Sequence, residues 1–339
     1  MASTASTDAL PESVGFIGLG AMGKPMAANL AKALPRGSQL HVHDAALAQV
    51  QELWTSFPDV VVRCWSAQEV AEASDVVITM LPEGAHVKSV YLDPTTGVIA
   101  ALSSSPSRPK LFIDSSTIDT ASSLHVKQEL SAVSATASFY DAPVSGGVLG
   151  AENGTIAFFL GCSPSDRNIA RLNALLQTMG AKVVPCGGPS LGLAAKLSNN
   201  YLSGIITIAC AEAMDMGMRA GIDARVLAAV FAAGTAQNTI CDVFNPVPGV
   251  CGRAPSSNGY RGGFRVQLMR KDIGLAVDMA RTVGARNVLG ASGLGVYVAA
   301  SAAADCRDLD SRVVYRYLGG RENWEHDQEE QIAKAGETR

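Results

Sequence analysis

A glycine-rich segment near the start of the chain constrains the fold more than any other feature. Residues 14–32 read VGFIGLGAMGKPMAANLAK, in which Gly18, Gly20 and Gly23 form a GxGxxG motif between a strand pattern and a helical pattern. In this context the first glycine permits a tight turn, the second lets the backbone approach a pyrophosphate, and the third allows a helix to pack closely on a strand. The predicted dinucleotide-binding residues of this loop are Gly18, Leu19, Gly20, Ala21, Met22 and Gly23.

Strand and helix patterns alternate from this motif to about Val184. The runs with strand character are VGFIGL, LHVHD, VVVR, DVVITML, KLFIDSS, SFYDAP, TIAFFLG and AKVVPC. Alternation of this kind is typical of βαβ units, which build a mostly parallel sheet with helices on both faces. The sequence therefore predicts an α/β fold whose first part, residues 13–188, is a Rossmann dinucleotide-binding domain.

The strand pattern stops after Gly188, and the residues beyond it have only helical patterns. Predicted helices cover residues 191–220, 224–233, 265–283 and 288–304, with a loop rich in Pro and Gly at 245–263. We therefore expect an all-helical domain at residues 189–319 that serves substrate binding and dimerisation. The ends of the chain, 1–12 and 320–339, are expected to be flexible because they are poor in apolar residues.

Composition and spacing argue against several classes of protein. With 47% hydrophobic and 17% charged residues the chain is globular, and a net charge of −4 without a basic stripe does not favour nucleic acid as a partner. The apolar run at 288–304 is at the short limit for a membrane span, and its GxxxG-like spacing favours close helix packing. No histidine or cysteine spacing fits a metal site, and no GxSxG elbow favours a hydrolase.

Further positions are expected to contact the cofactor. Asp44 ends the second predicted strand, near the offset from the glycine motif at which a carboxylate binds the ribose 2′-hydroxyl. A carboxylate there repels a 2′-phosphate, and no Arg follows it, so NAD is favoured over NADP. Two later strands end in MLP and DSST, which makes Leu81, Pro82 and Thr117 expected walls of the cofactor site.

Two segments are candidates for the substrate site. Exposed amides of Ser145, Gly146 and Gly147 in YDAPVSGGVLGA would suit a carboxylate, although the same residues could form an ordinary glycine turn. Lys196 and Asn200 in LAAKLSNNYL are four residues apart and share one face of an apolar helix. Burial lowers the pKa of a lysine, so a lysine in such a helix can serve as an acid and base near neutral pH, although a snorkelling lysine is the alternative.

These motifs together resemble the β-hydroxyacid dehydrogenase family over residues 14–318. The resemblance is carried by FIGLGAMGKPMAANL, DAPVSGGVLGAENGT and GLAAKLSNN. A fourth segment, FNPVPGV followed by GYRGGF, resembles the branch of the family that acts on 3-hydroxyisobutyrate.

The resemblance implies a role for each candidate residue. Lys196 would be the general acid and base, Asn200 would orient the substrate, and residues 145–147 would bind the substrate carboxylate. Lys271, in the KD pair of the family, would approach the cofactor or the active site. The implied reaction is NAD-dependent oxidation of 3-hydroxy-2-methylpropanoate to methylmalonate semialdehyde in valine breakdown, by a homodimer or homotetramer.

Two positions depart from the family pattern. Ser190 stands where the family often has a glycine, so the local turn is expected to differ. Thr239 stands near a position where close relatives carry an aromatic residue, which predicts a wider substrate pocket.

Other functions and compartments are also compatible with the motifs. One is an NADPH-dependent reductase of a small semialdehyde, such as glyoxylate, succinic semialdehyde or tartronate semialdehyde, and another is a non-catalytic nucleotide-binding scaffold. Lys196 argues against a scaffold, and Asn199 stands where a 6-phosphogluconate dehydrogenase would have a histidine. Because the first residues lack an Arg-rich amphipathic leader, we expect the cytoplasm, with the mitochondrion as the alternative.

Overall fold

The computed structural model describes residues 10–104 and 109–325. These described residues divide into two compact units, with the boundary between Lys196 and Leu197. The division falls inside one long helix, α9 (Leu191–Arg219), whereas the sequence pattern placed the end of the first domain at residue 188.

The first unit is built on a six-stranded parallel sheet. Its strand order is β3-β2-β1-β4-β5-β6, which is the doubly wound order of dinucleotide-binding domains with its switch point between β1 and β4. The predicted Rossmann fold is therefore confirmed. The strands are β1 (Ser13–Ile17), β2 (Gln39–His43), β3 (Val61–Arg63), β4 (Val76–Thr79), β5 (Lys110–Asp114) and β6 (Ala137–Asp141).

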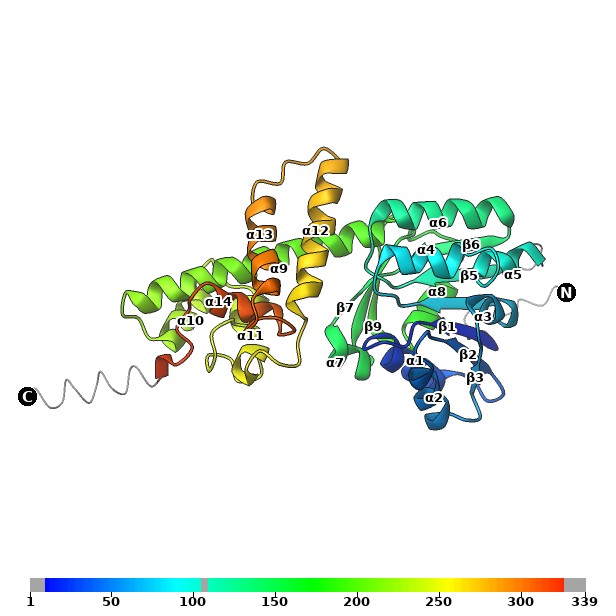
Figure 1. The fold of residues 1–339 in the computed structure, drawn as a ribbon, viewed down its shortest axis with the longest axis horizontal. Coiled ribbons are helices and arrows are strands. Elements are labelled where there is room, and N and C mark those ends of the chain that lie inside the picture. The colour runs from blue at the N-terminus through cyan, green and yellow to red at the C-terminus, as the bar shows by residue number, and fades with distance from the viewer. Residues whose placement is uncertain (1–9, 105–108, 326–339) are drawn as a thin grey trace, which may run out of the picture. The chain divides into compact units, whose positions relative to one another are not determined.

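Helices cover both faces of this sheet (Figure 1). Because side chains alternate along a strand, Val76 and Ile78 of β4 point into one core while Val77 points into the other. The first core also takes side chains from α1 and α2, and the second from α3 to α6. These helices are α1 (Gly23–Ala33), α2 (Leu47–Ser56), α3 (Ala67–Ala73), α4 (Gly84–Leu92), α5 (Val98–Ser104) and α6 (Thr120–Val133).

A second sheet of the same unit was not anticipated from the sequence. It contains β7 (Val144–Ser145), β8 (Ile156–Leu160) and β9 (Gly180–Pro185), with α7 (Gly147–Glu152) and α8 (Ile169–Leu176) in the connections. The last two predicted strands thus lie outside the main sheet. The physical reason is local: Pro143 has no N–H to continue the ladder of β6, and the short β7 after it pairs antiparallel with β8.

The second unit is helical in all its described elements. The four helices predicted from the sequence are confirmed as α9, α10 (Ala224–Ala233), α12 (Val266–Thr282) and α13 (Gly290–Ala302). Four short elements were not predicted: α11 (Thr239–Val243), η1 (Pro255–Asn258), η2 (Ser311–Val313) and α14 (Val314–Tyr317). Within the described ranges we find no helix that combines the length and apolar character of a membrane span.

Small residues bring three long helices of this unit close together. Figure 1 shows α12 and α13 side by side. A Cβ on Gly293 of α13 would lie 2.3 Å from Ile205 of α9, and a Cβ on Gly204 of α9 would lie 2.6 Å from Ile273 of α12. The glycines of the apolar run at 288–304 therefore allow close helix packing, as predicted.

Part of the expected C-terminal tail is packed. Trp324 is buried, its indole nitrogen donates a 2.8 Å hydrogen bond to Pro248 O, and the guanidinium of Arg225 lies over its ring. Residues 320–325 therefore belong to the helical unit. The rest of the expected flexible ends, apart from residues 10–12, lies outside the described residues.

Candidate active site

The loop after β1 has the geometry that a bound pyrophosphate requires. Gly18 has a φ of +92°, and a Cβ there would lie 2.3 Å from Met80 O. A Cβ on Gly23 would lie 1.9 Å from Gly18 O, so only a glycine lets α1 pack this closely on the turn. Gly20 is exposed with nothing near its Cβ position, and no side chain caps the N-terminus of α1. Open space beside a helix N-terminus fits an anionic cofactor.

The other residues of this loop have different surroundings. Ala21 is exposed and Met22 is half-buried. Leu19 is fully buried in the core on one face of the sheet, so its side chain supports the loop from below.

Asp44 is held beside the glycine loop by two backbone groups. Its Oδ2 accepts a 2.6 Å hydrogen bond from Leu19 N–H, and its Oδ1 accepts one of 2.6 Å from Ala46 N–H. The first bond joins the end of β2 to the loop after β1, and Gly18 N–H reinforces it by donating to His43 O. The carboxylate is thus fixed at the strand end where it was predicted.

The ends of β4 and β5 are joined by a buried network that was not predicted from the sequence. Asp114 Oδ1 accepts hydrogen bonds from Thr79 Oγ1 at 2.7 Å and from Ser116 Oγ at 2.5 Å. Ser116 Oγ in turn accepts from Leu81 N–H at 2.8 Å. The motif DSST contained the signal, because an Asp at the end of a fully buried strand needs partners. This network positions Leu81. Of the neighbouring candidates, Pro82 is exposed and Thr117 is half-buried.

Burial dominates the protonation of Asp114. Desolvation raises the pKa of this carboxyl to about 6, although the hydrogen bonds from Ser116 and Thr79 act in the opposite direction. Its Oδ2 has no hydrogen-bond partner among the described residues. Asp114 is therefore a carboxyl whose ionisation is unfavourable in the folded chain.

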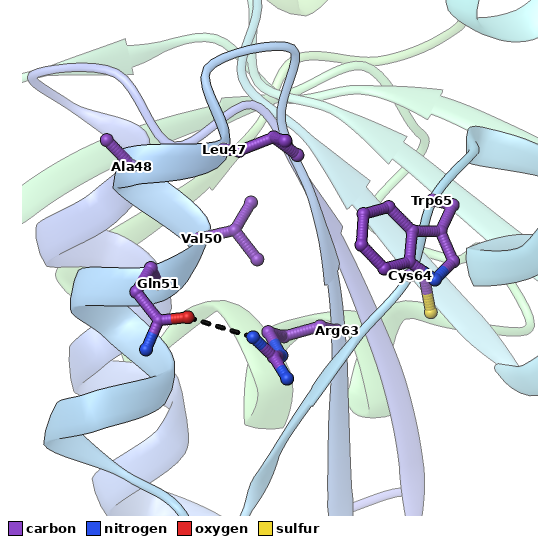
Figure 2. Close-up of a pocket in the computed structure, with 7 residues that line it drawn as sticks. All are labelled: Leu47, Ala48, Val50, Gln51, Arg63, Cys64 and Trp65. Carbon is purple, nitrogen blue, oxygen red and sulfur yellow. Dashed lines mark hydrogen bonds between the residues drawn. The ribbon is translucent and has the colours of Figure 1, made fainter.

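A pocket of about 310 Å³ lies at the outer edge of the main sheet, between α2 and the end of β3 (Figure 2). Leu47 and Val50 of α2 face Trp65 across it, and Gln51 accepts a 2.8 Å hydrogen bond from Arg63. Trp65 is 71% exposed, which is unusual for so large an apolar side chain. The full lining is Leu47, Ala48, Val50, Gln51, Arg63, Cys64 and Trp65.

The predicted substrate loop is a turn that only glycine adopts without strain. Gly146 has a φ of +138° and Gly147 a φ of +65°. Both residues are exposed, and Ser145, the last residue of β7, is half-buried. An exposed turn with successive residues at positive φ can present backbone amides to a carboxylate.

The start of α9 is anchored to the end of β6. Asp141 is buried, and its two oxygens accept hydrogen bonds from Ser190 N–H at 2.7 Å and from Leu193 N–H at 2.8 Å. Ser190 has a φ of +65°, a conformation that favours glycine and costs a non-glycine residue free energy. Asp141 was not among the predicted residues, and its only signal was a carboxylate at the end of a buried strand.

The two predicted catalytic side chains lie one turn apart on α9. Lys196 and Asn200 are both buried. Asn200 Nδ2 donates a 2.6 Å hydrogen bond to Asp272 Oδ2, and Lys271 Nζ lies 3.3 Å from Asp272 Oδ1. The structure thus brings Asn200 and Lys271 to one buried carboxylate of α12, which was not among the residues predicted from the sequence.

Thr239 is the first residue of α11 and is exposed. The wider substrate pocket expected at this position stays a prediction.

Comparison with known families divides the chain much as its fold does. Residues 13–188 match the family described as the NAD binding domain of 6-phosphogluconate dehydrogenase. Residues 191–318 match the family described as NAD-binding of NADP-dependent 3-hydroxyisobutyrate dehydrogenase. The two matches leave only short segments of the chain unassigned.

Individual relatives match the chain over nearly its whole length. A probable mitochondrial 3-hydroxyisobutyrate dehydrogenase of Dictyostelium discoideum is 40% identical and aligns over 91% of each chain. A 3-hydroxyisobutyrate dehydrogenase of Pseudomonas aeruginosa is 38% identical over 91% of this chain and 99% of its own.

Solved structures agree with the sequence comparison. A structure of Mycobacterium tuberculosis 3-hydroxyisobutyrate dehydrogenase with L-serine superposes with a TM-score of 0.81 at 35% identity, covering 91% of this chain and 99% of that one. The resemblance inferred from the motifs is therefore confirmed. The chain is an oxidoreductase with a Rossmann NAD(P)-binding domain, and it belongs to the β-hydroxyacid dehydrogenase family, in the branch that its 3-hydroxyisobutyrate dehydrogenase relatives form.

Proposed function

We propose that the chain oxidises 3-hydroxyisobutyrate to methylmalonate semialdehyde with NAD, as a step of valine degradation. The observation that carries the proposal is the pair of buried side chains on α9, Lys196 and Asn200, in a chain whose relatives are named for this activity. The bound nicotinamide would supply the hydride acceptor.

The residues of the chain would divide the remaining work. Lys196, as a neutral amine, would take the proton of the substrate hydroxyl while the carbon that bears it loses hydride. Asn200, held by Asp272, would orient the hydroxyl beside this amine. The amides of residues 145–147 would bind the substrate carboxylate, and the proton would leave through Lys196 to solvent. One alcohol would thus become one aldehyde, with one hydride transferred to the nicotinamide and one proton released to solvent.

Asp44 supports NAD rather than NADP as the physiological cofactor. Its carboxylate is fixed by Leu19 and Ala46, so it cannot swing away from the ribose without losing two hydrogen bonds. A 2′-phosphate placed there would face a fixed negative charge. Lys271 would contribute a positive charge toward the cofactor or the active site.

The pocket between α2 and the end of β3 would take the adenine ring. Adenine and the 2′-hydroxyl belong to the same nucleoside, and α2 begins only a few residues after Asp44, so a ribose bound at Asp44 would place the base toward this pocket. The pocket is apolar on the side of Leu47 and Val50, and Trp65 offers an exposed ring on the other side (Figure 2). Stacking on an aromatic ring is a common way to hold a base.

Initial rates with purified protein test the proposed function. NAD and NADP would each be combined with 3-hydroxyisobutyrate, 3-hydroxypropionate, serine, threonate and 4-hydroxybutyrate. The expected result is a kcat/KM for NAD with 3-hydroxyisobutyrate far above every other pair. A higher value for NADP or for another acid would overturn the valine-pathway assignment and keep the dehydrogenase chemistry.

One observation favours a second candidate, a reductase of a small semialdehyde with NADPH. The family that matches residues 191–318 is described by an NADP-dependent enzyme. Rates of NADH and NADPH oxidation with glyoxylate, succinic semialdehyde and tartronate semialdehyde distinguish the two candidates.

Compartment and assembly are part of the same proposal. The names of the Dictyostelium, fly and mammalian relatives include "mitochondrial", which supports the mitochondrial alternative over the cytoplasm.

A homodimer or homotetramer would cover apolar side chains that are exposed on the helical unit. These are Leu202, Met216, Val226 and Val230. Light scattering of the purified protein measures the assembly.

A further inference from the structure

The carboxylate of Asp141 caps the N-terminus of α9, a role that usually belongs to the side chain of the residue just before the helix. The first intrahelical bond of α9 runs from Ala194 N–H to Ser190 O, so Ser190 occupies the capping position and Leu193 is the third residue of the helix. The N–H of that third residue is the group that a capping side chain usually binds. Here Asp141 accepts it at 2.8 Å from the end of β6, 52 residues away in sequence.

Ser190 does not cap the helix itself. Its φ of +65° is not the extended conformation of an ordinary capping residue, and its hydroxyl donates instead to Thr120 O at 3.1 Å. Its own N–H goes to Asp141 at 2.7 Å. The first turn of α9 therefore depends on a side chain from the sheet.

Close backbone packing leaves α9 little freedom to shift around this anchor. A Cβ on Gly192 would lie 2.1 Å from Phe159 O and 2.8 Å from Asp141 Oδ2. A Cβ on Gly161, just after β8, would lie 1.9 Å from Asp141 Oδ1. The carboxylate is thus enclosed by two glycines and two helix N–H groups, and the helix rests directly on the ends of β6 and β8.

The start of α9 offsets part of the cost of burying the charge of Asp141. Burial raises the pKa of this carboxyl, and the backbone hydrogen bonds from Leu193 and Ser190 oppose that shift. A negative charge at the N-terminus of a long helix is also stabilised by the helix dipole. The N–H groups and the dipole at the start of α9 thus stabilise the carboxylate, and the carboxylate in turn stabilises the first turn of the helix.

We infer that Asp141 is a positioning residue for Lys196. Lys196 lies three residues after Leu193, on the same side of the helix. The hydrogen bond from Leu193 N–H to Asp141 therefore fixes how α9 is rotated about its own axis and how far Lys196 lies from the end of β6. Asp141 ends β6, so its carboxylate ties the helix that would carry the base to the main sheet, while the substrate loop that follows is held separately by the pairing of β7 with β8. This inference rests on the proposed function of Lys196.

The test replaces Asp141 by asparagine. The Asp141→Asn side chain keeps the volume but has one acceptor for two N–H groups, so one helix N–H loses its partner. The expected result is a kcat at least tenfold lower, with the Kd of NADH within twofold of wild type because the glycine loop lies on other strands. The KM of the hydroxy acid is expected to change little, because the substrate loop is held by β7 and β8.

Asp223→Ala provides the matched control. Asp223 caps α10 through hydrogen bonds from Arg225 N–H and Val226 N–H at 2.8 and 3.0 Å, so its removal likewise takes capping hydrogen bonds from the start of a helix but leaves the start of α9 unchanged. The control is expected to lose stability and to retain kcat. Equal losses of kcat in both variants would mean that general destabilisation is responsible, and would overturn the inference.

A double-mutant cycle shows whether Asp141 acts through Lys196. If it does, Asp141→Asn lowers the rate in the wild-type background but hardly lowers the residual rate of Lys196→Ala. Equal factors in both backgrounds, or a kcat of Asp141→Asn within twofold of wild type, would overturn the inference.

Hydrogen exchange separates this inference from the proposed function. Faster exchange of the Leu193 amide in Asp141→Asn, with unchanged exchange in α12, is expected from the loss of the anchor. If the wild type oxidises no hydroxy acid with either cofactor, the proposed function is wrong, and the catalytic role inferred for Asp141 is wrong as well. The exchange result is independent of this outcome, because it measures only whether Asp141 holds the start of α9.

Discussion

The side-chain amide of Asn200 donates a 2.6 Å hydrogen bond to the carboxylate of Asp272, and both side chains are buried. The oxygen of the same amide accepts a 3.1 Å hydrogen bond from Asn199 Nδ2, so the amide has a single orientation. An amide held in this way loses little rotational freedom when a substrate binds, which is the property required of a residue that orients a hydroxyl group.

Asp272→Asn is expected to lower kcat/KM by about ten- to a hundredfold, because a hydrogen bond to a charged group contributes about 1.5–3 kcal/mol. Steady-state rates with the best hydroxy acid measure the effect. Asp278→Asn on the exposed face of the same helix, where Asp278 pairs with Arg281, is the control and is expected to match wild type. Wild-type kinetics for Asp272→Asn would show that the amide does not need this anchor.

Lys196→Ala is expected to reduce turnover by about 10²–10⁴-fold, the usual contribution of general acid and base catalysis. NADH binding should persist, because the glycine loop and Asp44 are unaltered. Steady-state turnover and NADH titration by fluorescence measure the two quantities. Unchanged turnover would exclude Lys196 as the base, and absence of turnover in the wild type would favour a nucleotide-binding scaffold.

Asp44→Ser is expected to lower kcat/KM for NAD and raise it for NADP, because the substitution removes the negative charge that a 2′-phosphate would meet. The ratio of the two values, measured with one hydroxy acid, is the readout. Asp59→Ser, an exposed change in the same unit, should leave the ratio unaltered. A ratio that does not move in Asp44→Ser means that cofactor preference is decided elsewhere.

Asp114→Asn is expected to change how stability depends on pH. The pKa of Asp114 is about 6 in the folded chain against an ordinary value of 3.8, so its contribution to stability is fully present below pH 3.8 and is lost as pH rises through 6. The loss is at most about 3 kcal/mol. Asparagine has no charge to bury, so the variant should gain stability relative to wild type as pH rises from 4 to 7.

Urea unfolding followed by tryptophan fluorescence at several pH values measures this difference for Asp114. The difference in unfolding free energy between variant and wild type should grow with pH and then level off near pH 7. A difference that is constant with pH would contradict the raised pKa.

Trp65→Ala is expected to raise the Kd of NADH about fivefold or more, because stacking of a base on an aromatic ring contributes about 1–3 kcal/mol. The Kd of reduced nicotinamide mononucleotide, which lacks adenosine, should not change. Trp65→Phe should bind NADH nearly as wild type, and Val283→Ala, another largely exposed apolar side chain, should have no effect. Equal weakening of both ligands would mean that the pocket does not hold adenine.

Local patterns along the chain were enough to predict the elements and residues that depend on neighbours in sequence. The GxGxxG spacing indicated a tight turn at Gly18 and close packing at Gly23, and both are found, because a turn and the start of a helix are formed by adjacent residues. The long apolar periodicity after Gly188 likewise predicted α9 to within a residue at either end.

The pairing of buried polar groups, by contrast, depends on how whole elements pack in three dimensions. Asp141 reaches Leu193, Thr79 reaches Asp114, and Asn200 reaches Asp272. None of these pairs has a periodic signature, because the partners are tens of residues apart and meet only when β6, β5 and α12 have taken their places. A buried carboxylate must find donors, but the pattern of the chain does not specify which donors, since the packing of the sheet and the helices brings them together.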